Sequence, residues 1–265
     1  MNTRIPVTLT IAGSDSGGGA GIQADLKTFC ALGVFGTSAI TCITAQNPDA
    51  VTGIEAVSSK LITAQIKAVT SGFPVAATKT GMLFSADVIH AVAKTLKRVN
   101  CGPLVVDPVM VSTSGTRLLK LDAMEALFRE ILPLATVITP NLNEAEILAS
   151  CKITSLKALQ KAALIISKRF GTACLAKGGH LASGKVVDVL CVENELTLFT
   201  APRVRLRGTT HGTGCTFSAA LTASLAKGED LHEAVAIAKS FVTEALKHAR
   251  PTGKHYPLNF MLNEI

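Results

Sequence analysis

Short apolar runs with the spacing of β-strands alternate with apolar patterns of helical spacing along almost the whole chain. Val7, Leu9 and Ile11 alternate with polar residues in a predicted strand over 7–12, and a predicted helix over 21–32 follows it. Strands that alternate with helices form a mainly parallel sheet covered on both faces, so the pattern predicts an α/β fold. The other predicted strands cover 36–45, 76–81, 104–106, 136–139, 173–177, 186–192 and 195–200, and the other predicted helices 61–71, 86–98, 122–131, 143–150, 155–170 and 231–249.

Polar and glycine residues stand where several of these predicted strands end. In sheets of this kind, ligands bind beyond the carboxyl ends of the strands. We therefore expect a site at this edge of the sheet. The residues concerned are Gly13, Gln46, Gly81, Met82, Asp107, Asn141, Lys177, Gly178 and Gly179.

A glycine-rich turn over 210–216 leads directly into a helical pattern that includes Phe217. Gly212 and Gly214 let backbone N–H groups turn to one side, and a helix N-terminus adds partial positive charge. This combination predicts a site for an anion, most often a phosphate. Cys215 in the first turn is then a candidate low-pKa thiolate. An ordinary helix start with a half-buried cysteine is the alternative, and the stretch alone favours neither.

The composition is that of a globular protein. The 265 residues are 48% apolar, which is enough for a sizeable core, and we expect one domain over 1–265. Mean hydropathy is +0.40. No run of about 18 apolar residues occurs, so we expect no membrane span. The N-terminus leads into the first strand and does not resemble a signal peptide.

The charge and the cysteine content of the chain exclude further classes of function. The 7 cysteines are scattered without a C-x-x-C pair, which indicates a reducing, cytoplasmic setting without disulfides or zinc. The net charge is +7, but the basic residues are spread out and the chain has one Tyr and no Trp. Nucleic-acid binding is therefore not expected. A basic balance suits anionic small substrates such as nucleotides.

Three motif matches suggest other functions. The segment 19–24 fits a dinucleotide-binding G-x-G-x-x-A pattern, but Gln46 stands where that pattern needs an acidic residue. The segment 179–185 resembles a phosphate-binding Walker A loop, but a strand pattern follows it where the motif needs a helix. His211 and Cys215 are four residues apart, as in some hydrolases, but nothing identifies an orienting third residue.

Several strand-end residues have both a functional and a structural interpretation. Asn141 and Glu144 have the spacing of a helix capping box, and Glu144 is also a candidate ligand for hydrated magnesium. Asp107 is either a turn cap or a group near metal. Lys177 is either solvated or placed to contact a transferring phosphoryl group.

The predicted ligand pocket has the same ambiguity. Gln46 offers a donor and an acceptor to a heteroaromatic ring, or is a loop amide. Met82 and Val109 pack on a flat ring, or belong to the core. Asp25 accepts hydrogen bonds from a ligand, or simply favours the start of its helix.

Taken together, these motifs resemble one family. The segment 8–28 closely resembles the N-terminal signature of hydroxymethylpyrimidine and hydroxymethylpyrimidine-phosphate kinases, thiamine-biosynthesis enzymes of the ribokinase-like superfamily. Further matches occur in order along nearly the whole chain. They are 44–47, 79–83, 106–110, 139–145, 177–180 and 211–216.

The resemblance implies a fold and a set of roles. The fold would be a ribokinase-like three-layer sandwich with a small lid. Cys215 would be a general base at the position where most such kinases carry Asp, and Lys177 would contact the moving phosphate. Gly13, Ala20, Asp25, Gln46, Met82 and Val109 would line a pyrimidine pocket; Gly212, Thr213 and Gly214 would form an anion hole; Asn141 and Thr210 would bind ATP; and Glu144 and Asp107 would hold Mg²⁺.

The implied activity is ATP-dependent phosphorylation of 4-amino-5-hydroxymethyl-2-methylpyrimidine and then of its monophosphate, by a homodimer in the cytoplasm. A pyridoxine or pyridoxal kinase and a non-catalytic ligand-binding relative are the alternatives. The sequence departs from the family pattern at Thr209, where Asn is common, and at Thr113 and Thr116, where charged residues are frequent.

Overall fold

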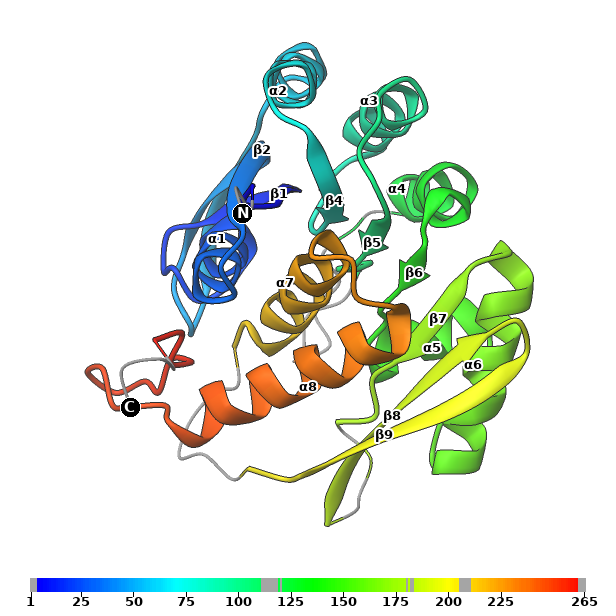
Figure 1. Cartoon of the computed structure of the whole chain (residues 1–265). Helices are drawn as coiled ribbons and strands as arrows, with labels where there is room; N and C mark the ends of the chain where they lie inside the picture. The colour runs from blue at the N-terminus through cyan, green and yellow to red at the C-terminus, as the bar shows by residue number, and fades with distance from the viewer. Residues whose placement is uncertain are drawn as a thin grey trace.

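The computed structural model describes residues 4–110, 119, 121–179, 181, 184–204 and 211–261. One 9-stranded sheet runs through this part of the chain in the order β3-β2-β1-β4-β5-β6-β7-β8-β9 (Figure 1). Its strands are β1 (Val7–Asp15), β2 (Phe35–Gln46), β3 (Val51–Ala56), β4 (Val75–Thr80), β5 (Leu104–Val106), β6 (Val137–Ile138), β7 (Ala173–Ala176), β8 (Lys185–Val192) and β9 (Glu195–Pro202).

The central strands are parallel, as the alternating pattern predicts. β1 pairs in parallel with β2 and β4, and β4, β5, β6 and β7 continue the parallel order. β3, β8 and β9 are added in antiparallel orientation at the two edges. The carboxyl ends of six parallel strands therefore meet at one edge of the sheet.

Helices cover both faces of the sheet, which gives three layers (Figure 1). The helices α1 (Gly21–Ala31), α7 (Thr213–Ala226) and α8 (Leu231–Lys247) pack on one face. The other face carries α2 (Ser59–Gly72), α3 (Ala86–Leu96), α4 (Leu121–Ala126), α5 (Leu142–Ala149) and α6 (Leu156–Phe170). The three-layer α/β sandwich expected from the family resemblance is confirmed.

The short strand β5 shows why the parallel strands are apolar throughout. Leu104 and Val106 pack into the core beneath α2 to α6, while Val105 packs into the core beneath α7 and α8. Successive side chains of a strand point to opposite faces, so a strand covered on both sides has no polar face. All three residues are buried.

Two elements differ from the prediction. β3 was not predicted, because its sequence, interrupted by Gly53 and Glu55, has no apolar face; all six of its residues are exposed. The helix predicted over 122–131 is α-helical only to Ala126 and continues as a π-helical turn, Leu127–Ile131. A 3-10 turn, Leu132–Leu134, then ends the helical segment, because Pro133 lacks an N–H to donate to the preceding turn.

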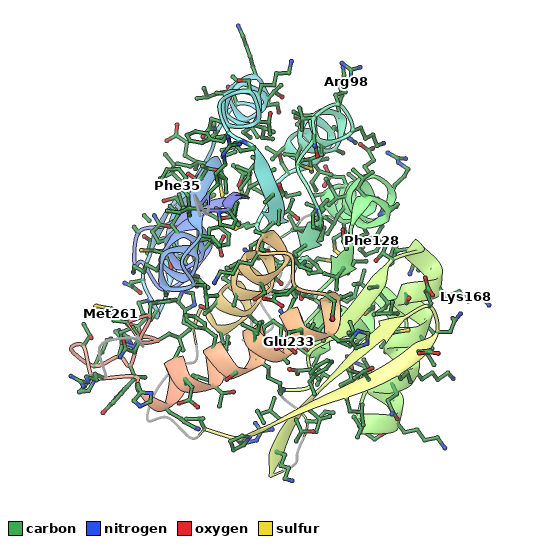
Figure 2. All side chains as sticks on the ribbon, viewed as in Figure 1. Phe35, Arg98, Phe128, Lys168, Glu233 and Met261 are labelled. Atoms are coloured by element: carbon green, nitrogen blue, oxygen red, sulfur yellow. The ribbon has the colours of Figure 1, made fainter. Side chains whose placement is uncertain are left out.

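Many charged side chains lie on the outside of the molecule, away from the buried charged residues near the strand ends. Figure 2 shows Arg98 and Lys168 pointing away from the ribbon at separate places, and both are exposed, as is Glu233 on α8. None of the helices in the described ranges combines the length and apolar character needed to cross a membrane.

Candidate active site

The strand-end residues come together as predicted. β1 ends at Asp15 and β2 at Gln46, while Gly81, Asp107 and Lys177 directly follow β4, β5 and β7. The start of α7 lies against the same edge, because it contacts the loop after β1 and the residues after β5 and β7. Residues far apart in the sequence therefore form one site beyond the carboxyl ends of the strands.

The start of α7 depends on Gly212. Its φ is 87°, in the left-handed region that favours glycine, and no side chain caps the helix there. A Cβ at this position would collide with the carbonyl oxygen of Gly19. Close contact between the two glycine loops thus places the N-terminus of α7 beside the loop after β1. Thr210 lies outside the described residues, as do Thr113, Thr116 and Thr209.

Asp107 and Lys177 form an ion pair next to this helix start. Lys177 Nζ lies 3.3 Å from Asp107 Oδ1, and Ser218 Oγ donates to Asp107 Oδ2 at 3.2 Å. An added Cβ on Gly214 would lie 3.5 Å from Lys177 Nζ. The lysine ammonium is therefore close to the first turn of α7, as a group that neutralises a phosphate there must be.

A second buried ion pair supports the turn that carries Lys177. Asp188 on β8 accepts a hydrogen bond from the Gly178 N–H at 2.9 Å, and its other oxygen lies 2.6 Å from Lys239 Nζ on α8. Sequence patterns did not identify this support, because the partners are separated by 10 and 51 residues. It links α8, on one face of the sheet, to the Lys177 turn.

The structural interpretation of Asn141 and Glu144 is confirmed, since the two form a capping box. Glu144 Oε2 accepts from the Asn141 N–H at 2.9 Å, and Oε1 accepts from the Met110 N–H at 3.0 Å. Burial and the nearby Asp107 carboxylate raise the pKa of Glu144 to about 7, against the opposing effect of Lys177. The capping box does not exclude a second role, because each oxygen keeps a lone pair.

The carboxylates fit a hydrated magnesium ion better than a fully protein-bound metal. No group of three or more His, Cys, Asp or Glu side chains within the described ranges is placed to hold a metal. Mg²⁺ commonly keeps several waters and binds one or two carboxylates plus substrate phosphates. Burial is the main cause of the raised pKa of Glu144 and the nearby Asp107 carboxylate adds to it, so a cation beside the two carboxylates would favour their ionised forms.

The low pKa predicted for Cys215 is wrong. Cys215 is half-buried in the first turn of α7, and burial raises its pKa to about 11. Lys79 and a hydrogen bond from the Gly21 N–H favour the thiolate, but Asp25 and Asp107 oppose it. Desolvation, together with the two carboxylates, therefore outweighs the groups that favour the thiolate.

Asp25 lies beneath the site and is not exposed to it. Its Oδ2 accepts from Thr10 Oγ1 at 2.6 Å and pairs with Lys79 Nζ at 2.9 Å, and neither ion-pair side chain is accessible to solvent. Asp25 Oδ1 is buried without a hydrogen-bond partner. Burial raises the pKa of Asp25, although Lys79 opposes the effect. The role of Lys79 was not predicted, because its local sequence is that of an ordinary strand lysine.

The other predicted pocket residues lie near the same edge. An added Cβ on Gly13 would lie 2.7 Å from Cys42 Sγ and 3.8 Å from Met82 Cβ, so β1 and the residues after β4 approach closely there. Val109 has a φ of 45°, which is strained for a β-branched residue. Strain of this kind concentrates at functional sites.

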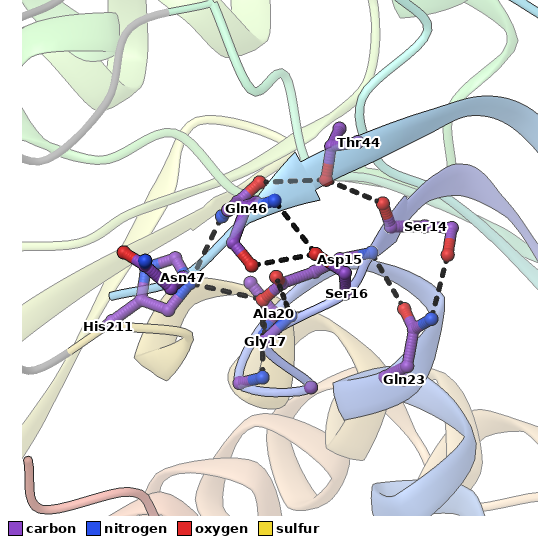
Figure 3. Close-up of polar contacts among 12 residues, drawn as sticks. Ser14, Asp15, Ser16, Gly17, Ala20, Gln23, Thr44, Gln46, Asn47 and His211 are labelled. Atoms are coloured by element: carbon purple, nitrogen blue, oxygen red, sulfur yellow. Dashed lines mark hydrogen bonds and ion pairs between the residues drawn. The ribbon is translucent and has the colours of Figure 1, made fainter. Parts of the chain in front are cut away.

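A polar network joins Gln46 to the loop after β1 and to His211 (Figure 3). Asp15 Oδ2 accepts from the Ala20 N–H at 2.8 Å and lies 3.2 Å from His211 Nε2. Gln46 Nε2 also lies 3.2 Å from His211 Nε2. His211 thus turns Nε2 toward Asp15 and Gln46, which removes support for the hydrolase alternative with Cys215. Asp15 was not identified from the sequence.

Comparisons with known proteins agree with this site. The model of the phosphomethylpyrimidine kinase family matches residues 15–259. The chain is 48% identical to a hydroxymethylpyrimidine/phosphomethylpyrimidine kinase of Haemophilus influenzae, with 97% of each chain covered. It is 45% identical to a bifunctional thiamine-biosynthesis protein of Geobacter sulfurreducens, over 99% of this chain but only 54% of that longer protein.

Solved structures give the same result. A phosphomethylpyrimidine kinase from Clostridium difficile is 44% identical with a TM-score of 0.82, covering 92% of this chain and 100% of that one. A Staphylococcus aureus pyridoxal kinase in complex with AMP-PCP and pyridoxal is 35% identical with a TM-score of 0.89, covering 98% and 95%. With its glycine loops, strand-end Asp107 and Lys177, and these matches, the chain belongs to the phosphomethylpyrimidine kinase family.

Proposed function

We propose that this kinase transfers the γ-phosphoryl group of ATP to the hydroxymethyl oxygen of 4-amino-5-hydroxymethyl-2-methylpyrimidine, and then phosphorylates the monophosphate to the pyrophosphate. One observation carries the proposal: Gln46 and the Asp107–Lys177 pair lie on either side of the loop contact at the start of α7. The ring and the triphosphate would therefore have separate places at one sheet edge. As a member of its family, the chain is a phosphotransferase.

The transfer depends mainly on positioning and charge neutralisation. The new bond forms between the substrate hydroxymethyl oxygen and the γ-phosphorus, the bond from the γ-phosphorus to the bridging oxygen breaks, and ADP leaves. Gly212, Thr213 and Gly214 supply backbone N–H groups for the phosphoryl oxygens. Lys177 neutralises charge on the moving group, and Asn141 and Thr210 contribute to ATP binding.

Magnesium belongs to the same proposal. Asp107 and Glu144 would hold a hydrated Mg²⁺, which supplies positive charge to the triphosphate when it is bound. The repulsion between these two buried carboxylates supports this assignment.

Gln46 would bind the amino-substituted edge of the pyrimidine, with Gly13, Ala20, Met82 and Val109 lining the rest of the pocket. Asp25 would contribute to the pyrimidine pocket from beneath it, because its buried Oδ1 has no hydrogen-bond partner. Cys215 would face the reacting hydroxyl and accept its proton as a general base, not as a covalent nucleophile. Its pKa of about 11 means that only a small fraction of the thiol is ionised at neutral pH.

Pyridoxal is the second candidate substrate, because the S. aureus neighbour binds it and has a TM-score of 0.89. The deciding experiment compares kcat/KM for the hydroxymethylpyrimidine and for pyridoxal by following ADP release. We expect the pyrimidine to be the better substrate. A preference for pyridoxal would overturn the assignment, and no ADP release with either ring would favour a non-catalytic ligand-binding role.

We also propose a homodimer that works in the cytoplasm as a single domain, with no nucleic-acid or membrane partner. The structure describes all seven cysteines, and each is a free thiol, which suits a reducing compartment. Three apolar side chains on the β2–β3 hairpin, Ile43, Val51 and Ile54, are exposed. Such residues favour contact with a second copy of the chain.

A further inference from the structure

Beside the proposed pyrimidine pocket, the carboxylate of Asp15 is surrounded by N–H donors (Figure 3). Its Oδ1 accepts from the Gly17 N–H at 2.8 Å, and its Oδ2 accepts from the N–H groups of Ala20 at 2.8 Å and Gly19 at 3.2 Å. Burial alone would raise the pKa of Asp15, but hydrogen bonds from His211 and from backbone N–H groups hold it below its usual value. An ionised carboxylate only accepts, so His211 Nε2, 3.2 Å from Oδ2, carries a hydrogen and donates it.

This placement of the hydrogen decides how the Gln46 amide is oriented. Gln46 Nε2 lies 3.2 Å from His211 Nε2, and two N–H groups cannot bond to each other. While the single Nε2 hydrogen of His211 points toward Asp15, the amide avoids a donor–donor contact only when it turns over and presents Oε1, which then shares this N–H with Asp15. The two orientations of an amide have nearly the same shape, so the turn needs no other movement.

Thr44 accommodates the turned amide. Its Oγ1 donates to the Ser14 carbonyl at 2.8 Å and lies 3.2 Å from the amide oxygen of Gln46. Since its hydrogen is already used, the Thr44 oxygen is better suited to accept from an NH₂ group than to face a carbonyl. Hydrogen bonds at both polar atoms of the Gln46 amide thus favour one orientation, with Oε1 toward His211 and Nε2 toward Thr44.

The orientation matters because an amide can read a neighbouring donor and acceptor on a ring in two-point contact, as Asn and Gln read adenine. The 4-amino group and adjacent ring nitrogen of the pyrimidine form such a pair. A 4-oxo pyrimidine presents the reverse pattern, with an acceptor at C4 and a hydrogen on the adjacent nitrogen. The ring nitrogen of pyridoxal has no polar substituent on a neighbouring carbon. A fixed amide therefore distinguishes these rings, and a freely turning amide does not.

We propose that Asp15 and His211 are positioning residues that fix the orientation of the Gln46 amide and thereby make the pocket select an amino-substituted pyrimidine. This inference rests on the proposed function, because it assumes that Gln46 meets the ring. Neither residue needs to touch the substrate. Their effect is on the choice between rings and not on the phosphoryl transfer itself.

Equilibrium binding of two rings without ATP, measured by calorimetry, tests the proposal. The rings are 4-amino-5-hydroxymethyl-2-methylpyrimidine and its 4-oxo counterpart. We expect the wild-type chain to prefer the amino ring, and His211→Phe to reduce that preference roughly tenfold, the effect of about one hydrogen bond. His211→Gln, whose amide nitrogen can donate in place of Nε2, should keep most of it. His90→Phe, at an exposed histidine that pairs with Glu130, is the matched control and should change nothing.

The outcomes separate this inference from the function on which it rests. Equal weakening of both rings in His211→Phe, with the preference unchanged, would show a merely structural role and overturn the inference. If the wild-type chain binds neither ring, the proposed function fails with it. If His211→Phe does not fold, as judged by thermal unfolding, His211→Asn takes its place, because its shorter amide cannot reach Asp15 from the same backbone position. An unchanged preference in that variant would equally overturn the inference.

Discussion

At the scale of single residues, the protonation of Cys215 is the point on which the chemistry depends. Burial raises its pKa to about 11, so the thiol keeps its proton at neutral pH. A thiol must ionise before it can accept a proton. If Cys215 is the general base, the rate must follow the small ionised fraction, which grows as the pH rises toward that pKa.

We therefore expect kcat/KM for the pyrimidine to rise about tenfold per pH unit between pH 7 and pH 9.5, because each unit multiplies the thiolate fraction by about ten below the pKa. Cys215→Ser should lose activity and show little pH dependence, since a serine hydroxyl does not ionise in this range. Initial rates at saturating magnesium and ATP measure both profiles. A flat wild-type profile, or unimpaired turnover by Cys215→Ser, would remove the base role.

The buried pair of Lys79 and Asp25 gives a prediction about stability. Lys79→Met leaves the Asp25 carboxylate buried without its counter-ion, and we expect the free energy of unfolding to fall by about 3–5 kcal/mol. Lys152→Met is the matched control, because its partner Glu146 is near the surface and the lysine is 86% exposed. Lys152→Met should lower the free energy of unfolding by only about 0–1 kcal/mol. If urea unfolding shows the same loss of unfolding free energy for both variants, burial does not decide how much the Lys79–Asp25 pair contributes to stability.

Residues at the ends of strands were predictable because the position alone implies a role. Asp107, Lys177 and Gln46 were found in this way. Lys79 and Asp25 were not recognised as a pair, since 54 residues separate them and nothing in the local sequence connects them. The same holds for Asp15 and His211, which are 196 residues apart.

At the scale of elements, the start of α7 depends on its contact with the loop after β1. Gly212→Ala introduces a Cβ that collides with the Gly19 carbonyl and strains a φ of 87°. Gly228→Ala is a matched control, with a φ of 91° but nothing within 4 Å of the added Cβ. We expect each to destabilise the chain by roughly 1–2 kcal/mol through backbone strain. Only Gly212→Ala should also lose kinase activity, by at least about tenfold.

Steady-state rates and thermal unfolding of both variants measure this difference. Loss of activity in Gly228→Ala, or full activity in Gly212→Ala, would show that the loop contact does not shape the anion site.

Helices and buried strands were predicted within a few residues, because each carries its own apolar pattern. β3 was missed because its pairing with β2, and not its own sequence, makes it a strand.

At the scale of the whole molecule, the exposed apolar side chains on the β2–β3 hairpin predict self-association. Ile54→Lys places a charge on the edge strand β3 of this hairpin and should shift the chain from dimer to monomer in light scattering. Leu198→Lys on β9 is the control, because Leu198 is similarly exposed, at 44% compared with 41% for Ile54, at the opposite edge of the sheet. A wild-type monomer, or a dimer that Ile54→Lys leaves intact, would contradict the proposed interface.

The order of strands could not be predicted from the sequence. Periodicity identifies each strand but does not say which strands pair, so the position of β1 between β2 and β4 appears only in the folded chain. That order brings the end of β1 beside Gln46 and, through Gly19, beside Gly212. The site is thus a property of the whole sheet, although each of its residues belongs to a locally predictable element.

The most direct test of the account counts the phosphates added to the ring. Wild-type protein is incubated with magnesium, ATP and 4-amino-5-hydroxymethyl-2-methylpyrimidine, and the products are followed by mass spectrometry. We predict the monophosphate first and the pyrophosphate later, with one ADP for each phosphate, and a loss of at least about a hundredfold in both steps for Lys177→Met. ATP hydrolysis without a phosphorylated ring, or undiminished transfer by Lys177→Met, would contradict the account.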